Sequence, residues 1–125
     1  MKMYEVIEFA SLYEKIKESK MPLKTAYNFS RLMRQLEKEI IFYQTEFTKI
    51  IQSYAKKDEN GKFITTDDGE SVEIINGKEI ECNTKIFELK NLDVEISDIS
   101  FKLEELGNLD LTIGEISCIL SLIEE

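Results

Sequence analysis

A long apolar seam between residues 26 and 54 constrains the fold of this chain more than any other sequence feature. Its apolar residues recur at alternating spacings of three and four, the heptad pattern of a helix that packs along its whole length in a helical hairpin or coiled coil. We predict one helix from Pro22 to Lys57, on the order of 50 Å long. The seam consists of Ala26, Phe29, Met33, Leu36, Ile40, Tyr43, Phe47, Ile50 and Tyr54.

A shorter helix is predicted at residues 3–19, where apolar residues at helical spacing form a broad face. Pro22 ends this helix, because the residue before a proline is pushed out of the α region. Residues 1–57 are therefore predicted to form a helical hairpin. The shorter helix reaches about half the length of the longer one, so the distal half of the seam needs another cover.

Residues 58–82 change to a pattern of turns and strands. The dipeptides Asn60-Gly61, Asp68-Gly69 and Asn76-Gly77 recur every eight residues, and such pairs suit the tight turns of β-hairpins. We expect a small antiparallel β-meander, which needs the helices behind it to be stable. Its three strands are predicted at Lys62–Thr66, Val72–Ile75 and Lys78–Cys82.

Residues 83–125 are predicted to form short helices and one strand. Asn83 caps a helix that runs to Asn91, Leu92–Ile96 alternate as a half-exposed strand, and a further helix runs from Asp98 to Gly107. Thr112 and Glu115 form a capping box for a last helix. The predicted fold is α+β and mostly α, with residues 1–125 in a single domain.

The residue types argue against most enzymatic chemistry. The 125 residues include no histidine, which removes the commonest general base and transition-metal ligand. The five glycines form no phosphate-binding loop, and the acids of residues 58–70 do not fall at EF-hand positions. We predict no enzyme activity, no cofactor and no metal, and we expect Cys82 and Cys118 to be free thiols.

Hydropathy and charge predict the compartment and the class of partner. No apolar run is long enough to cross a bilayer, and residues 1–9 carry two acids where a signal peptide would carry a basic region, so we expect no membrane association and a cytoplasmic location in the host cell. Residues 1–57 carry 11 Lys+Arg and 7 Asp+Glu, net +4, whereas residues 58–125 carry 5 and 18, net −13. The acidic residues predicted to contact a basic partner are Asp67, Asp68 and Glu70.

A basic zone lies on and between the first two predicted helices. Acids are interleaved with it and the net charge of the chain is −9, which argues against direct nucleic-acid binding. Docking against the acidic half of the same chain is an alternative role for this zone. Its residues are Lys15, Lys17, Lys20, Lys24, Arg31, Arg34 and Lys38.

Several stretches resemble a family of short, uncharacterised proteins encoded by phages and prophages of Gram-positive bacteria. They are Lys20-Met21-Pro22 before a long helix with Tyr27 and Arg31, residues 54–61 at the end of that helix, and the tail residues 111–115 and 122–125. The resemblance implies a phage origin. It implies no mechanism, because no activity is assigned to the family.

Two functions from different classes follow. The first is a non-enzymatic phage or prophage protein that binds a host or phage protein, as a defence inhibitor or an assembly accessory. The second is a sponge that binds a small ligand or nucleotide in a pocket lined by Lys, Arg and Tyr.

The uncovered distal seam predicts self-association into a homodimer or a higher assembly. The alternative is that the last helix, with Ile116, Ile119, Leu120 and Ile123, folds back on this end. In the assembly, Phe47→Asp should give a monomer whose free energy of unfolding is several kcal/mol lower, because it removes apolar burial and adds an unpaired charge. Light scattering measures the oligomeric state of both proteins. A monodisperse monomer of the unmutated protein at high concentration would contradict the prediction. The self-association residues are Tyr43, Phe47, Ile50 and Tyr54.

Overall fold

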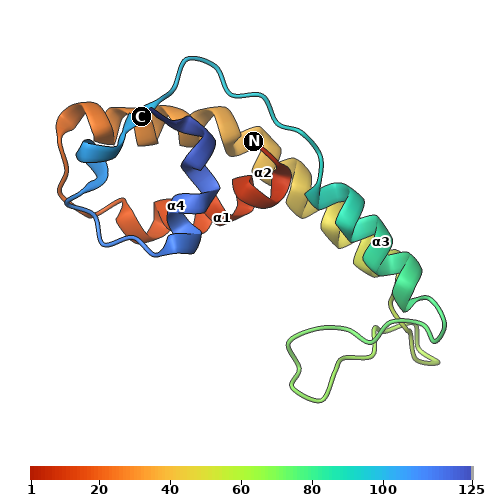
Figure 1. Cartoon of the computed structure of the whole chain (residues 1–125). Coiled ribbons are helices and arrows are strands. Elements are labelled where there is room, and N and C mark those ends of the chain that lie inside the picture. The colour runs from red at the N-terminus through yellow and green to blue at the C-terminus, as the bar shows by residue number, and fades with distance from the viewer. Residues whose placement is uncertain (125) are drawn as a thin grey trace. The chain divides into compact units, whose positions relative to one another are not determined.

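A computed structural model describes residues 1–124 and is drawn in Figure 1. It confirms an α+β class that is mostly helical. No helix among the described residues has both the length and the apolar character that a membrane span requires. The elements are α1 (Met3–Ile16), α2 (Leu23–Tyr54), α3 (Glu79–Lys90), β1 (Phe101–Lys102), η1 (Leu103–Leu106), α4 (Ile113–Ile119), η2 (Leu120–Leu122) and β2 (Ile123–Glu124), where η denotes a 3₁₀ helix.

The chain divides into two compact units that share α2. Unit 1 contains Met1–Ile41 and the described residues from Asn91 onward, and unit 2 contains Phe42–Lys90. The long second helix is confirmed, but α2 ends at Tyr54 and not at the predicted Lys57, because residues 55–57 form isolated β-bridges. The single domain, with its parts at 1–57, 58–82 and 83–125, stays a prediction.

An aromatic cluster forms the centre of unit 1. The ring of Phe29 on α2 lies 6.2 Å from that of Phe9 on α1 and 4.5 Å from that of Phe101 on β1. Burial of such large rings contributes strongly to a core of this size. β1 and β2 pair in parallel, with Phe101 opposite Ile123. Other fully buried side chains of unit 1 include Met3, Val6, Leu12, Leu32, Leu36 and Ile119.

Polar side chains of α2 hold the segment that leads into β1. The amide of Gln35 donates to the Ser97 carbonyl at 2.8 Å and accepts from the Ser97 N–H at 3.0 Å. Arg31 donates to the Asp98 carbonyl at 3.2 Å. The predicted helix from Asp98 to Gly107 is wrong in its first half, because Asp98 has φ 55° and the chain then extends into β1. Only η1, which ends before Gly107 as predicted, is helical there.

The predicted strand at Leu92–Ile96 is reduced to one antiparallel bridge. Lys2 pairs with Asp93 in this bridge, and their side chains form an ion pair at 2.7 Å. Backbone bonds join Met3 to Leu92 and Val94 to Met1. Because α1 begins at Met3, the partner segment is too short for a ladder.

The predicted antiparallel β-meander is not formed as strands in unit 2. Residues 55–57, 63–65 and 72–74 instead make three isolated antiparallel bridges. Their backbone hydrogen bonds close a ring: Lys56 N–H donates to Glu73, Glu73 N–H to Ile64, and Ile64 N–H to Lys56, at 2.8 to 3.0 Å. Each segment divides its bonds between two partners, so no pair extends into a ladder. The three predicted turns are present, and Gly61, Gly69 and Gly77 all have positive φ.

The third predicted strand, Lys78–Cys82, is wrong because α3 begins at Glu79. The N–H of Gly77 donates to the Glu79 carboxylate at 2.9 Å, and Lys78 pairs with Glu81 at 3.2 Å. Acidic side chains in the first turn also stabilise the helix, because the N-terminal end of the helix dipole is positive. Asn83 therefore lies inside α3 and does not cap it.

The capping box at Thr112 is confirmed. Thr112 Oγ1 accepts from the Glu115 N–H at 3.1 Å, and the Glu115 carboxylate accepts from the Thr112 N–H at 2.8 Å. α4, which begins here, packs on α1 within unit 1. The alternative in which the last helix covers the distal seam stays a prediction.

The unit 1 core predicts a sharp contrast between two leucines of α2. Leu32 is 0% exposed and Leu23 is 87% exposed. Leu32→Ala should lower the free energy of unfolding by about 2 to 5 kcal/mol, through lost burial and a residual cavity. Leu23→Ala should change it by about 0.5 kcal/mol or less. Urea unfolding of both variants tests this, and equal losses would contradict the packing around α2.

Candidate functional site

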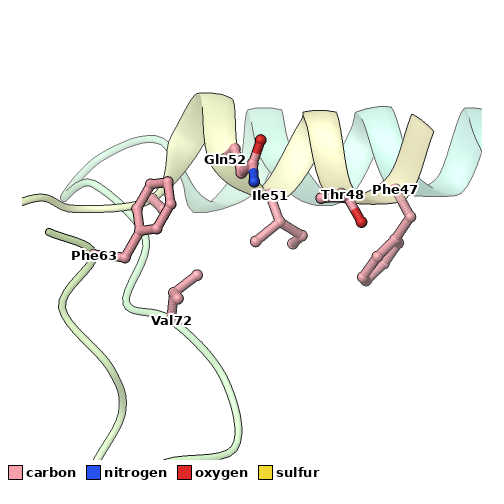
Figure 2. A pocket seen from close by; sticks show the side chains of 7 residues that line it. Phe47, Thr48, Ile51, Gln52, Phe63 and Val72 are labelled. Atoms are coloured by element: carbon pink, nitrogen blue, oxygen red, sulfur yellow. The ribbon is translucent and has the colours of Figure 1, made fainter. Parts of the chain in front are cut away.

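An apolar cleft lies within unit 2, along the C-terminal part of α2. Phe47, Ile51 and Ala55 recur at spacings of four and so form one stripe of this helix. Phe63 and Val72, from the bridged segments, face the stripe across a cavity of about 230 Å³. Figure 2 shows Phe47 and Ile51 pointing from the same side of α2 toward the space that Phe63 and Val72 close.

A second cavity continues the apolar cleft toward α3. It shares Phe47, Ile51 and Val72 with the first and has a volume of about 450 Å³. Because these three residues line both cavities, we treat them as one site. The further lining residues of the second cavity are Glu70, Ser71, Ile74, Cys82, Asn83 and Ile86.

Aromatic contacts shape both ends of the cleft. The rings of Tyr43 and Phe47 stack with centroids 5.7 Å apart, which supports the position of Phe47. At the other end the Lys57 ammonium lies 5.4 Å from the centroid of the Phe63 ring. Phe63 is nevertheless exposed, as are Phe42 and Ile75 of the same unit. Unit 2 thus leaves several large apolar side chains exposed to solvent.

An acidic turn at residues 67–70 borders the cleft. Asp68 accepts a hydrogen bond from the Thr66 hydroxyl and another from the Glu70 N–H, which together hold the pKa of Asp68 below its usual value. Asp67, Asp68 and Glu70 are all exposed, and none forms an ion pair with another described residue. Their charge is therefore directed to solvent or to a partner.

The side chains that line the apolar cleft are of types that suit the binding of a partner. The titratable ones among them are Glu70 and Cys82, and burial raises the pKa of the Cys82 thiol, which makes it a poor nucleophile. Residues 1–124 contain no group of three acidic or thiol side chains placed to hold a metal ion. A partner would meet aliphatic and aromatic groups with a few hydroxyl and amide groups at the edge.

The structure brings together two sets of residues that the sequence predicted separately. Phe47, predicted for self-association, and Glu70, predicted for partner binding, line the same cavity. Ile50 and Tyr54 do not line it, and the Tyr54 phenol is hydrogen-bonded to Glu81 of α3. Ile51 was missed because it lies outside the heptad seam. Its spacing of four from Phe47 and Ala55 was the available signal.

Among residues 1–124, three ion pairs join the basic half of the chain to its acidic half. Lys15 pairs with Glu115 at 2.8 Å, and Lys56 pairs with Glu73 at 3.8 Å. The third is the Lys2–Asp93 pair of unit 1. Some of the opposite charges of the two halves are therefore paired within each unit.

Comparison of the chain with protein-family models, curated proteins and solved structures finds no match.

The two cysteines should be unreactive in the folded protein. Both are buried free thiols, and burial raises the pKa of Cys118 to about 12. A thiol with such a pKa is roughly one part in ten thousand thiolate at pH 8, and the thiolate is the reactive form. A disulfide reagent at pH 8 should label neither cysteine until denaturant is added, and then both. Rapid labelling before denaturation, or no labelling after it, would contradict the structure.

Proposed function

We propose that this chain is a non-enzymatic, phage- or prophage-encoded protein that binds a segment of a host or phage protein in the apolar cleft of unit 2. The observation that carries the proposal is the apolar cleft beside an unpaired acidic turn. Defence inhibition and an accessory role in assembly are both compatible with such an activity, and the cytoplasm of the host cell is where it would operate.

The cleft specifies the chemistry of the partner segment. Interface energy concentrates in a few large side chains that fill pockets, and the space beside Phe47, Ile51 and Val72 suits an apolar or aromatic anchor. The acidic turn favours Lys or Arg next to that anchor and excludes acidic neighbours. The expected segment is therefore apolar and basic.

Two threonines on α2 provide a matched test. Both are exposed, but Thr48 lines the first cavity and Thr45, almost one turn earlier, lines neither cavity. Thr48→Trp should block the cleft without removing a buried side chain, and Thr45→Trp adds the same bulk elsewhere. Neither change should alter the unfolding temperature by more than a few degrees.

A random peptide library selected on the intact protein supplies the ligand for this test. Selected peptides should combine large apolar residues with Lys or Arg, and Thr48→Trp should weaken them at least tenfold while Thr45→Trp does not. Changing Asp67 and Asp68 to Asn and Glu70 to Gln together should slow association more than it speeds dissociation. Peptides that lack basic residues, or that bind Thr48→Trp unchanged, would overturn the proposal.

A further inference from the structure

A second hollow, within unit 1, is lined by charged and hydroxyl-bearing side chains. Lys24, Asn28 and Arg31 are spaced by four and three residues, so they lie on one face of α2. The hollow measures about 270 Å³, which is smaller than the sites that take drug-sized molecules. We call it the polar pocket. Its remaining lining residues are Asp98, Ser100, Lys102, Glu105 and Glu124.

Positive and negative groups line the polar pocket without pairing. No ion pair within 4.0 Å joins its three cations to its three acids in the described part of the chain. The ammonium groups of Lys24 and Lys102 also make no hydrogen bond to another described residue. Both signs of charge are therefore available to a molecule in the pocket.

Hydroxyl groups hold two of the carboxylates in position. The Ser100 hydroxyl donates to Glu124 at 2.8 Å, and that of Thr25, which is fully buried, donates to Glu105 at 3.5 Å. The amide of Asn28, only 8% exposed, donates to the Ser100 carbonyl at 3.1 Å. Such supporting contacts reduce the ordering cost when a ligand binds.

A backbone conformation that is uncommon for non-glycine residues occurs at the same pocket. Asp98 is the one non-glycine residue with a positive φ among those described. Arg31 fixes it by donating to its carbonyl, and Gln35 fixes the adjacent Ser97 through two bonds. Uncommon conformations that the surroundings enforce in this way concentrate at ligand sites.

We propose that the polar pocket binds a small zwitterion with an ammonium and a carboxylate on one carbon, the chemistry of a free α-amino acid. Lys24 and Lys102 contact the carboxylate, and Glu105 and Glu124 contact the ammonium. A nucleotide is disfavoured, because three carboxylates line the pocket and residues 1–41 and 91–125 carry 9 Lys+Arg and 15 Asp+Glu, net −6. This site is separate from the apolar cleft, so either proposal can fail alone.

Calorimetric titration of the intact chain with each of the common amino acids tests the ligand class. At least one should bind. The N-acetyl form of that amino acid lacks the ammonium and its methyl ester lacks the carboxylate, so each should bind about tenfold more weakly or worse. No binding by any amino acid, or equal binding of one blocked form, would overturn the proposal.

Charge-neutralising variants test whether the ligand binds in the polar pocket. The direction of the change in affinity distinguishes a zwitterion from a simple anion. For a zwitterion, Lys24→Gln and Glu105→Gln should both weaken binding by about tenfold or more. For a simple anion, Glu105→Gln would instead tighten binding, and this outcome would overturn the proposal. The matched controls Lys20→Gln and Glu104→Gln, which lie outside the pocket, should leave affinity unchanged. Unchanged affinity in the pocket variants would place the ligand elsewhere and would also overturn it.

Discussion

The apolar side of α2 is the constraint on which the rest of the structure depends. A helix of 32 residues cannot expose such a stripe to water, so other segments must cover it along its length. In unit 1, Phe9 of α1 and Phe101 of β1 contact Phe29 and exclude water from it. In unit 2, α3 and the bridged segments cover the stripe less completely. The space that they leave is the apolar cleft, so the candidate site follows from how this helix is covered.

The sequence predicted the features that are encoded locally. The period of α2, the capping box at Thr112 and the positive-φ glycines each depend on residues within a few positions of one another. The strand predicted at Lys78–Cys82 was wrong because the spacing of two between Ile80 and Cys82 does not reflect burial on one face: Cys82 is buried, whereas Ile80 is 82% exposed. The outcome was decided by the Gly77–Glu79 bond and by burial of Cys82 and Leu89 on one face of α3. Half-buried segments of this length need tertiary contacts to choose their structure.

The candidate site was predictable only as separate residues. Phe47 stood out through its heptad position and Glu70 through its charge, but nothing local places Val72 beside Ile51. The two residues are close only because the chain turns back along α2 after residue 54. No repeating spacing in the sequence marks this long-range arrangement. The polar pocket is harder still to anticipate. Lys24 and Glu105 are about eighty residues apart in the sequence, and each taken alone resembles an ordinary surface charge.

The ring of backbone bonds through Lys56, Ile64 and Glu73 has a consequence for how the chain can vary. Each of the three segments donates one of these bonds to a second segment and accepts one from the third, so the bonds hold all three segments together. The connections at Gly61 and Gly69 lie outside the ring. They can lengthen, shorten or change charge without breaking it, since exposed turns tolerate such changes well. The sequence of the acidic turn can therefore change while the three bridged segments keep their backbone bonds.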